Sequence, residues 1–263
     1  MEMWRRINSE RIWDKEPVFC LTADVDWAPE SALEIFFSEI HAFGFRPTIF
    51  VTNLSQVVED QFQRGLIDRG LHPNFLPGSS HGSTLTEVFD TVRQFAPETR
   101  CFRAHRGFDS TDSTHLVASR GIEYDSNAIT LMQTRLQPTL LESGLVRFPV
   151  YLEDGTYLFR DLDRSFEAFM HHLAYPGIKV LSVHPMNWVI NPPVITYMRS
   201  IKDSLSREDY NLMSHEVIEK VRHKGEGIKD FMIAVLRYAS QFKSYSLEQL
   251  YELSLSEPNR MEL

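Results

Sequence analysis

The sequence alternates short runs of β-branched and aromatic residues with longer amphipathic stretches, and this pattern recurs along most of the chain. Residues 18–23 and 178–183 are apolar almost throughout, as strands covered on both faces should be. Residues 29–44 carry apolar side chains at helical spacing. The alternation is typical of a parallel sheet covered by helices. It also predicts strands at 47–52 and 101–104, and helices at 54–65, 113–120, 164–174, 230–242 and 247–255.

The length of the chain and the number of these units constrain the fold class. No Pro/Gly/Ser-rich stretch or shift in charge marks a domain boundary within the 263 residues. Five or more strand–helix units in one domain of this size favour a closed or nearly closed α/β barrel over an open doubly wound sheet. We therefore expect one catalytic domain, residues 1–263, with its motifs within 18–190 and the helices of 193–256 packed outside the sheet.

Charge and composition exclude several classes of function. Lys and Arg number 27 against 36 Asp and Glu, so the formal charge is −9 and nucleic acid is not an expected partner. The first 16 residues lack the apolar core of a signal peptide, and no apolar run approaches the ~18 residues of a membrane span. We expect a cytoplasmic protein. Cys20 and Cys101 each stand alone in an apolar segment, which predicts two buried thiols.

Polar residues that directly follow the predicted strands mark the candidate site, because functional residues of such folds lie at the carboxyl ends of strands. They arise from separate strands but share one face of the sheet. These residues are Asp24, Asp26 and Trp27 after the first strand, His72 and His81 in a later loop, Arg103, His105 and Arg106 after residues 101–104, and His184 and Trp188 after residues 178–183.

Their residue types point to a metal-dependent hydrolase. Two acids at i and i+2 point to the same side of a strand end, so one can bind a metal while the other faces the water to be activated. A carboxylate with two neutral imidazoles is a normal set of three protein ligands for zinc or a similar ion. By itself the Asp-x-Asp is weak evidence, since acids at strand ends often cap the next helix. Trp27 and Trp188 suit either stacking on a sugar ring or forming a hydrophobic wall.

At these residues the sequence resembles the polysaccharide deacetylases, the NodB-homology or carbohydrate esterase family 4 enzymes, and most closely a branch linked to bacterial O-antigen biosynthesis. The resemblance spans about Val18 to Trp188. It rests on the segments Leu21-Thr22-Ala23-Asp24-Val25-Asp26, Arg46-Pro47-Thr48-Ile49-Phe50-Val51, Gly70-Leu71-His72-Pro73-Asn74-Phe75 with His81-Gly82, Phe102-Arg103-Ala104 and Leu181-Ser182-Val183-His184.

The resemblance implies a distorted (β/α)7 TIM-like barrel and hydrolysis of an N-acetyl group on a sugar of a bacterial surface polysaccharide or its precursor, with release of acetate. It makes Asp24 the catalytic base, His184 the general acid and Arg103 the residue that orients the base. The implied metal ligands are Asp26, His72 and His81, with zinc as the first choice of cation. Substrate contacts are expected from Trp27, His105, Arg106 and Trp188.

The sequence departs from the family pattern in three places. The two histidines of the second motif usually lie four apart, whereas nine positions separate His72 from His81. The third motif normally continues with proline and a tyrosine that lends its backbone N–H to the oxyanion, but His105 and Arg106 stand there. The acid that tunes the general-acid histidine has no clear counterpart, and Glu153 and Asp154 are both candidates.

Three other interpretations compete with a deacetylase. A nucleotide-sugar glycosyltransferase also binds a divalent ion through Asp-x-Asp, but it needs none of the histidines. A haloacid-type phosphatase begins with a strand and Asp-x-Asp, yet Ala28 stands where a threonine or valine is expected. A carbohydrate-binding homologue that has lost turnover is compatible with the altered third and fourth motifs. Acetate release from an N-acetylated sugar separates the deacetylase from all three.

Overall fold

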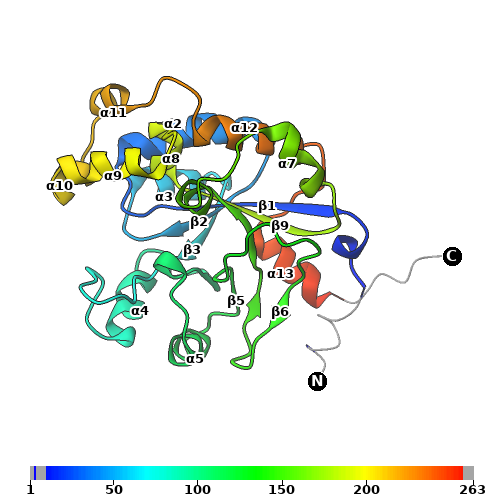
Figure 1. Cartoon of the computed structure of the whole chain (residues 1–263). Coiled ribbons are helices and arrows are strands. Elements are labelled where there is room, and N and C mark those ends of the chain that lie inside the picture. The colour runs from blue at the N-terminus through cyan, green and yellow to red at the C-terminus, as the bar shows by residue number, and fades with distance from the viewer. Residues whose placement is uncertain (1–2, 4–9, 257–263) are drawn as a thin grey trace.

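A computed structural model describes Met3 and residues 10–256 of the chain. Its centre is a sheet with the strand order β6-β7-β5-β4-β3-β2-β1-β9-β8, parallel except for the β6–β7 pair. Figure 1 shows the arrangement. The strands are β1 (Pro17–Asp24), β2 (Thr48–Val51), β3 (Asp68–Leu71), β4 (Cys101–Phe102), β5 (Tyr124–Asp125), β6 (Thr139–Leu140), β7 (Val146–Arg147), β8 (Val150–Glu153) and β9 (Gly177–Val183).

The helices alternate with these strands. Thr84 and Glu87 form a capping box at the start of α4, and Ser246 and Gln249 form another at the start of α13. The helices are α2 (Glu30–Ile40), α3 (Gln56–Gln63), α4 (Leu85–Arg93), α5 (Thr111–Ser119), α6 (Asp154–Phe159), α7 (Phe166–Leu173), α8 (Pro185–Ile190), α9 (Ile195–Ser204), α10 (Arg207–Asn211), α11 (His215–Val221), α12 (Ile228–Ala239) and α13 (Leu247–Leu255), with short 3₁₀ turns η1 (Ile12–Asp14), η2 (His41–Phe43) and η3 (His105–Gly107).

The sheet closes into a distorted barrel through residues 146–153, which form two short consecutive strands, β7 and β8. β7 pairs with β5 on one side of the ring, and β8 pairs with β9 on the other. Only Phe148 and Pro149 separate β7 from β8, and Pro149 has no N–H to donate to a ladder. Counted as one strand, this run completes a ring of seven, β1-β2-β3-β4-β5-β7/β8-β9. The (β/α)7 barrel expected from the family resemblance is confirmed.

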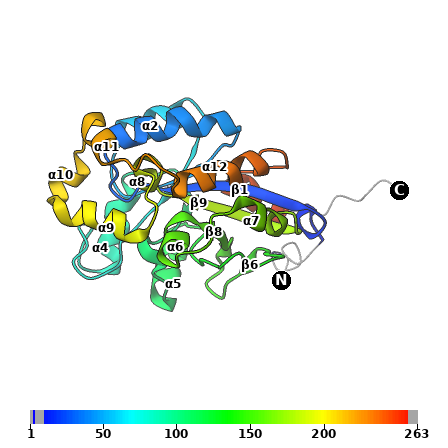
Figure 2. The ribbon, with the colours of Figure 1, turned by 45° about the horizontal axis from the view of Figure 1, so that its top comes forward.

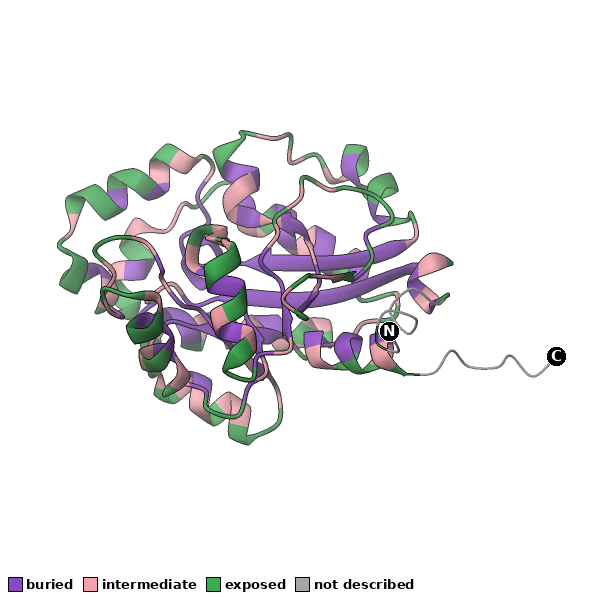
Figure 3. Cartoon of the chain, turned by 90° about the horizontal axis from the view of Figure 1, so that it is seen from below, coloured by how far each residue is buried: buried purple, intermediate pink, exposed green. Residues whose placement is uncertain are grey.

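Two apolar layers hold the barrel together, and the strands between them are buried (Figure 3). The outer layer packs Phe19, Leu21 and Leu181 of the strands against helices such as α2, α8 and α12. The inner layer contains Val18, Cys20, Phe50 and Val180 together with Leu247, Leu250 and Tyr251 of α13. Because α13 contributes its apolar face to the inner cluster, the expectation that all helices of 193–256 pack outside the sheet is wrong for α13.

Two further sequence expectations can be compared with the structure. Cys20 and Cys101 are fully buried and unpaired. In the part of the chain that the structure describes, no helix combines the length and the apolar character required to cross a bilayer.

Candidate active site

The chain leaves β1 through two strained residues that begin the site. Asp26 and Trp27 have φ angles of 47° and 56°, in the left-handed region that non-glycine residues rarely adopt. The backbone N–H of Trp27 donates to Thr52 Oγ1 at 2.9 Å, which holds this turn against the end of β2. Strain of this kind persists only where the surroundings over-determine it, and it concentrates at functional sites.

Asp24 lies at the end of β1 and is paired with Arg103. Arg103 Nη1 donates to Asp24 Oδ1 at 2.7 Å and also to Thr22 Oγ1 and Ser182 Oγ. Both side chains are almost fully buried. Burial alone would raise the pKa of Asp24, but the charges of Arg103, His72 and His184 together outweigh it, so the pKa lies below its ordinary value. Asp24 is therefore a carboxylate with one oxygen fixed by Arg103.

Asp26, His72 and His105 form a second cluster beside Asp24. Asp26 Oδ1 lies 3.1 Å from His72 Nε2 and 2.8 Å from His105 Nδ1. The N–H at His72 Nδ1 donates to the Arg103 carbonyl at 2.7 Å, which turns Nε2 toward the carboxylate. One donor atom of each residue lies within 4.8 Å of the others. Two imidazoles and one carboxylate that converge in this way match the ligand set of a divalent cation.

His81 lies close to this cluster but its ring nitrogens are used elsewhere. The backbone N–H of Asn74 donates to His81 Nδ1 at 3.1 Å, and His81 Nε2–H donates to the Thr52 carbonyl at 2.8 Å. Burial lowers the pKa of His81, so the neutral tautomer that these contacts require is favoured. The structure thus brings His105 to the cluster in the position expected for His81, and His81 instead supports the Thr52–Trp27 corner.

His184 faces the two acids of β1 from the opposite side. His184 Nε2 lies 4.0 Å from Asp24 Oδ2 and 3.8 Å from Asp26 Oδ2. Asp154, the first residue of α6, accepts from the His184 backbone N–H at 2.8 Å and contacts its Nδ1 at 2.6 Å. Burial disfavours the imidazolium, yet the carboxylates of Asp154, Asp26 and Asp24 together outweigh burial and raise the pKa of His184 well above its ordinary value. Of the two acids left open by the sequence, Asp154 is the partner of His184.

Glu153 is also in the site, although it does not hold His184. One of its carboxylate oxygens lies within 4.8 Å of donor atoms of both Asp24 and His184. Its Oε2 accepts from Thr156 Oγ1. Burial raises the pKa of Glu153. Glu153, at the end of β8, is therefore a fourth acid of the site beside Asp24, Asp26 and Asp154.

Comparison with known proteins identifies the family. The model of the WbmS-like polysaccharide deacetylase family matches residues 21–201, well over half of the chain. The chain belongs to the WbmS-like polysaccharide deacetylases. A solved structure from Bordetella bronchiseptica, described as a polysaccharide deacetylase involved in O-antigen biosynthesis, matches with a TM-score of 0.72 and 26% identity, over 83% of this chain and 89% of that chain.

Two more distant solved structures were also found, whereas no curated protein matched the WbmS-like chain. One is described as a polysaccharide deacetylase from Mycobacterium smegmatis, with 17% identity and a TM-score of 0.47 over 78% of this chain and 90% of that one. The other is the Xyl-CE4 domain of a multidomain xylanase from the hindgut metagenome of Trinervitermes trinervoides, with 12% identity and a TM-score of 0.44 over 93% and 94% of the two chains.

The remaining expected substrate contacts of the WbmS-like chain divide into two groups. Trp27 is half-buried, with its ring centroid 5.3 Å from that of His105. Arg106 is exposed, follows His105 in η3 and has a φ of 57°. Trp188, in contrast, is 1% exposed and donates its indole N–H to Glu39 Oε2 at 3.0 Å. It packs in the outer core, and the structure does not bring it to the Asp24–Asp26 cluster.

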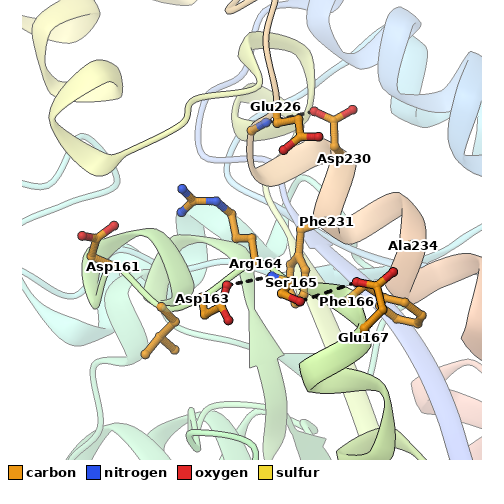
Figure 4. Close-up of a pocket in the computed structure, with 12 residues that line it drawn as sticks. Asp161, Asp163, Arg164, Ser165, Phe166, Glu167, Glu226, Asp230, Phe231 and Ala234 are labelled. Atoms are coloured by element: carbon orange, nitrogen blue, oxygen red, sulfur yellow. Dashed lines mark hydrogen bonds between the residues drawn. The ribbon is translucent and has the colours of Figure 1, made fainter.

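One hollow in the described part of the chain lies away from these residues. It has a volume of about 790 Å³ and separates the α6–α7 connection from the start of α12 (Figure 4). Arg164 and several carboxylates, among them Asp163, Glu226 and Asp230, line it. None of its lining residues belongs to the Asp24–Asp26 cluster, so we place the chemistry of the WbmS-like chain at the strand ends and not here.

Proposed function

We propose that this protein is a metal-dependent hydrolase that removes an N-acetyl group from a sugar of a bacterial surface polysaccharide or its precursor. The observation that carries the proposal is the pairing of two buried acid–cation contacts, Asp24 with Arg103 and Asp154 with His184, on either side of the Asp26–His72–His105 cluster. A candidate base, a candidate metal site and a candidate acid therefore lie side by side at the carboxyl ends of the strands. The O-antigen role described for the Bordetella bronchiseptica relative supports a surface polysaccharide as the destination.

The residues of the cluster fit a divalent cation, and zinc is our first choice. The contact from His72 Nδ1 to the Arg103 carbonyl fixes the tautomer in which Nε2 is free to bind. Asp26, His72 and His105 would hold the cation, and we propose His105 in place of His81 as the second imidazole ligand. When bound, such a cation acidifies water and polarises a carbonyl oxygen, and three protein ligands leave positions open for both.

The chain's own residues supply the proton transfers. Asp24, kept ionised by Arg103, takes a proton from the attacking water as its oxygen adds to the acetyl carbonyl carbon. His184, kept protonated by Asp154, gives its proton to the amide nitrogen as the carbon–nitrogen bond breaks. The products are acetate and the free amine of the sugar. In the part of the chain described, the backbone N–H of Arg106 has no hydrogen-bond acceptor, which makes it our candidate donor to the oxyanion.

Acetate release tests this function. We expect the purified protein supplied with zinc to release acetate and a free amine in equal amounts from N-acetylated hexosamines or their oligosaccharides, and to lose that activity in the presence of a chelator. A carbohydrate-binding homologue would bind the sugar without acetate release, and a glycosyltransferase would consume a sugar nucleotide without it. We also propose a cytoplasmic location, because two unpaired buried cysteines suit a reducing compartment.

A further inference from the structure

Helix α10 lies against the candidate site although it falls outside the residues 21–201 that the family model matches. The loop after it is tied to the start of α2, where Ser31 Oγ donates to the Met213 carbonyl and His215 pairs with Glu34 at 3.1 Å. Figures 1 and 2 show α9, α10 and α11 together at one end of the molecule. These contacts place α10 beside the turn that carries Asp26 and Trp27.

Arg207, the first residue of α10, places its guanidinium over the ring of Trp27. Its guanidinium carbon lies 5.3 Å from the Trp27 ring centroid, and the same ring lies 5.3 Å from the ring centroids of His105 and His81. One aromatic ring therefore separates the Arg207 guanidinium from the proposed ligand His105. The charge of Arg207 is also felt within the site, where it adds to the effect of burial in lowering the pKa of His81.

The guanidinium of Arg207 is available to a ligand. The side chain is exposed, and no carboxylate of residues 10–256 lies within ion-pair distance of it. Beside Trp27 is a hollow of about 470 Å³ between the start of α2 and the end of α10; Asn53, Asn211 and Glu30 are in its lining, and Arg207 lies outside it. The anionic group is therefore expected at the exposed guanidinium and not inside this hollow. A guanidinium presents its N–H groups as a planar fork, which binds a phosphate or carboxylate through two hydrogen bonds.

We propose that Arg207 selects an N-acetylated sugar that carries an anionic group, a phosphate or a carboxylate, with Trp27 packed against the sugar between that group and the acetamide. This inference rests on the proposed deacetylase function and deepens it by naming the substrate class. Arg207 is a specificity residue in this account and takes no part in bond breaking. The reaction that supplies this substrate must accordingly leave the sugar activated as a phosphate ester or oxidised to a uronic acid.

Binding and turnover of charged and uncharged sugars test the inference. The probes are N-acetylglucosamine and N-acetylgalactosamine, their 1-phosphates and the corresponding N-acetylhexosaminuronic acids, and calorimetry on the full-length, zinc-supplied protein gives Kd without requiring turnover. We expect Arg207→Ala to raise the Kd of the phosphates or of the uronic acids roughly 10- to 100-fold and to leave the Kd of the uncharged sugars unchanged. Raising the salt concentration should shrink the difference between charged and uncharged sugars in the wild type but not in the variant.

Arg199→Ala is the matched control. Arg199 is an exposed arginine on the neighbouring α9, it lies 6.0 Å from the ring centroid of Phe159, and its removal changes the net charge by the same amount. We expect this variant to bind all probes as the wild type does. If Arg207→Ala raises the Kd of the phosphates more, the anionic group is a phosphate. If it raises the Kd of the uronic acids more, the group is a carboxylate.

The outcomes separate this inference from the proposed function. An anion preference that depends on Arg207, without acetate release from any probe, supports the anion subsite and contradicts deacetylation. The anion subsite is overturned, and deacetylation is left standing, if acetate is released but Arg207→Ala and Arg199→Ala both bind charged and uncharged sugars with equal Kd values. Failure of every anionic probe to bind more tightly than its uncharged counterpart also overturns the anion subsite.

Discussion

The Asp154 carboxylate binds His184 at two points, through its backbone N–H at 2.8 Å and its Nδ1 at 2.6 Å. This double contact fixes both the position of the residue and the orientation of its ring. His184 Nε2 consequently faces the gap in front of Asp24 and Asp26, 4.0 Å and 3.8 Å from their carboxylates. An imidazole oriented in this way can give a proton only toward the substrate position.

Replacing Asp154 by asparagine should weaken His184 as an acid. Asp154 raises the pKa of His184 against the opposing effect of burial, so Asp154→Asn lowers that pKa. A general acid must be protonated, so the alkaline limb of the pH profile of kcat should move to lower pH and kcat at neutral pH should fall roughly 10²–10⁴-fold. Glu153→Gln, which removes an acid without contact to Nδ1, is the control. An alkaline limb that stays in place in Asp154→Asn contradicts the assignment.

The two histidines near Asp26 should differ in their effect on metal binding. His105→Ala removes a proposed ligand and should weaken zinc binding by more than the roughly 10- to 100-fold typical of residues that only support a ligand. His81→Asn should bind zinc nearly as the wild type does, because the His81 nitrogens are occupied by Asn74 and Thr52. Zinc titration against a competing chelator measures both. Equal losses in the two variants would show that His81 is a ligand after all.

Asp24, at the end of β1, and Asp26, two residues later, should have different roles. Asp26→Ala should lose bound metal, because it removes the carboxylate that faces both His72 and His105. Asp24→Asn should keep metal and lose roughly 10²–10⁴ in kcat, because it removes the base without changing the cluster. Metal content and acetate release measured on the same samples check both expectations. Near-normal turnover by Asp24→Asn would rule out Asp24 as the base.

Lys179 offers a test of stability outside the site. Its side chain is fully buried in β9, its Nζ has no hydrogen-bond partner among the described residues, and it lies 4.4 Å from the Tyr151 ring centroid. Burial lowers the pKa of Lys179 to about 8. At pH 7 the amine is charged in both the folded and unfolded states, so its desolvation opposes folding. We expect Lys179→Met to raise the free energy of unfolding by roughly 1–3 kcal/mol at pH 7.

The pH dependence of that effect gives the control. Between pH 8 and about 10.5 the unfolded state binds the proton and the folded state does not, so wild-type stability gains with rising pH and the advantage of the variant shrinks. Urea denaturation of both proteins at pH 7 and pH 10 measures the difference. A variant less stable than the wild type at pH 7 would show that the contact with Tyr151 outweighs desolvation.

Local patterns in the sequence predicted β1, β2, β4, β9 and about half of the helices, because each depends on its own residues. β1, β9 and α13 lie where periodicity placed them. The place of α13 in the inner core was not predictable, because an amphipathic stripe shows that a helix buries one face but not which surface covers it. Closure of the ring through β7 and β8 depends on pairings with β5 and β9 that no local pattern encodes.

The site was predicted in part for the same reason. The structure brings Asp24, Asp26, His72, Arg103 and His184 close together, as expected for residues at the carboxyl ends of parallel strands, which share one edge. The exchange of His81 for His105 in the cluster depends on η3, whose Arg106 adopts a positive φ, and on Asn127, which accepts from the Ala104 N–H at 2.9 Å. The spacing of residues along the chain reveals neither of these two features. The nine-residue gap after His72 was the available signal that His81 departs from the family pattern.

A divalent cation held by Asp26, His72 and His105 is the claim on which the proposed chemistry depends. Anomalous diffraction from a crystal grown with zinc locates the ion and its ligands in one measurement. We predict one peak about 2.0–2.2 Å from a carboxylate oxygen of Asp26 and from one ring nitrogen each of His72 and His105. A peak coordinated by His81, or one bound only by Asp24, Glu153 and His184, would contradict the account.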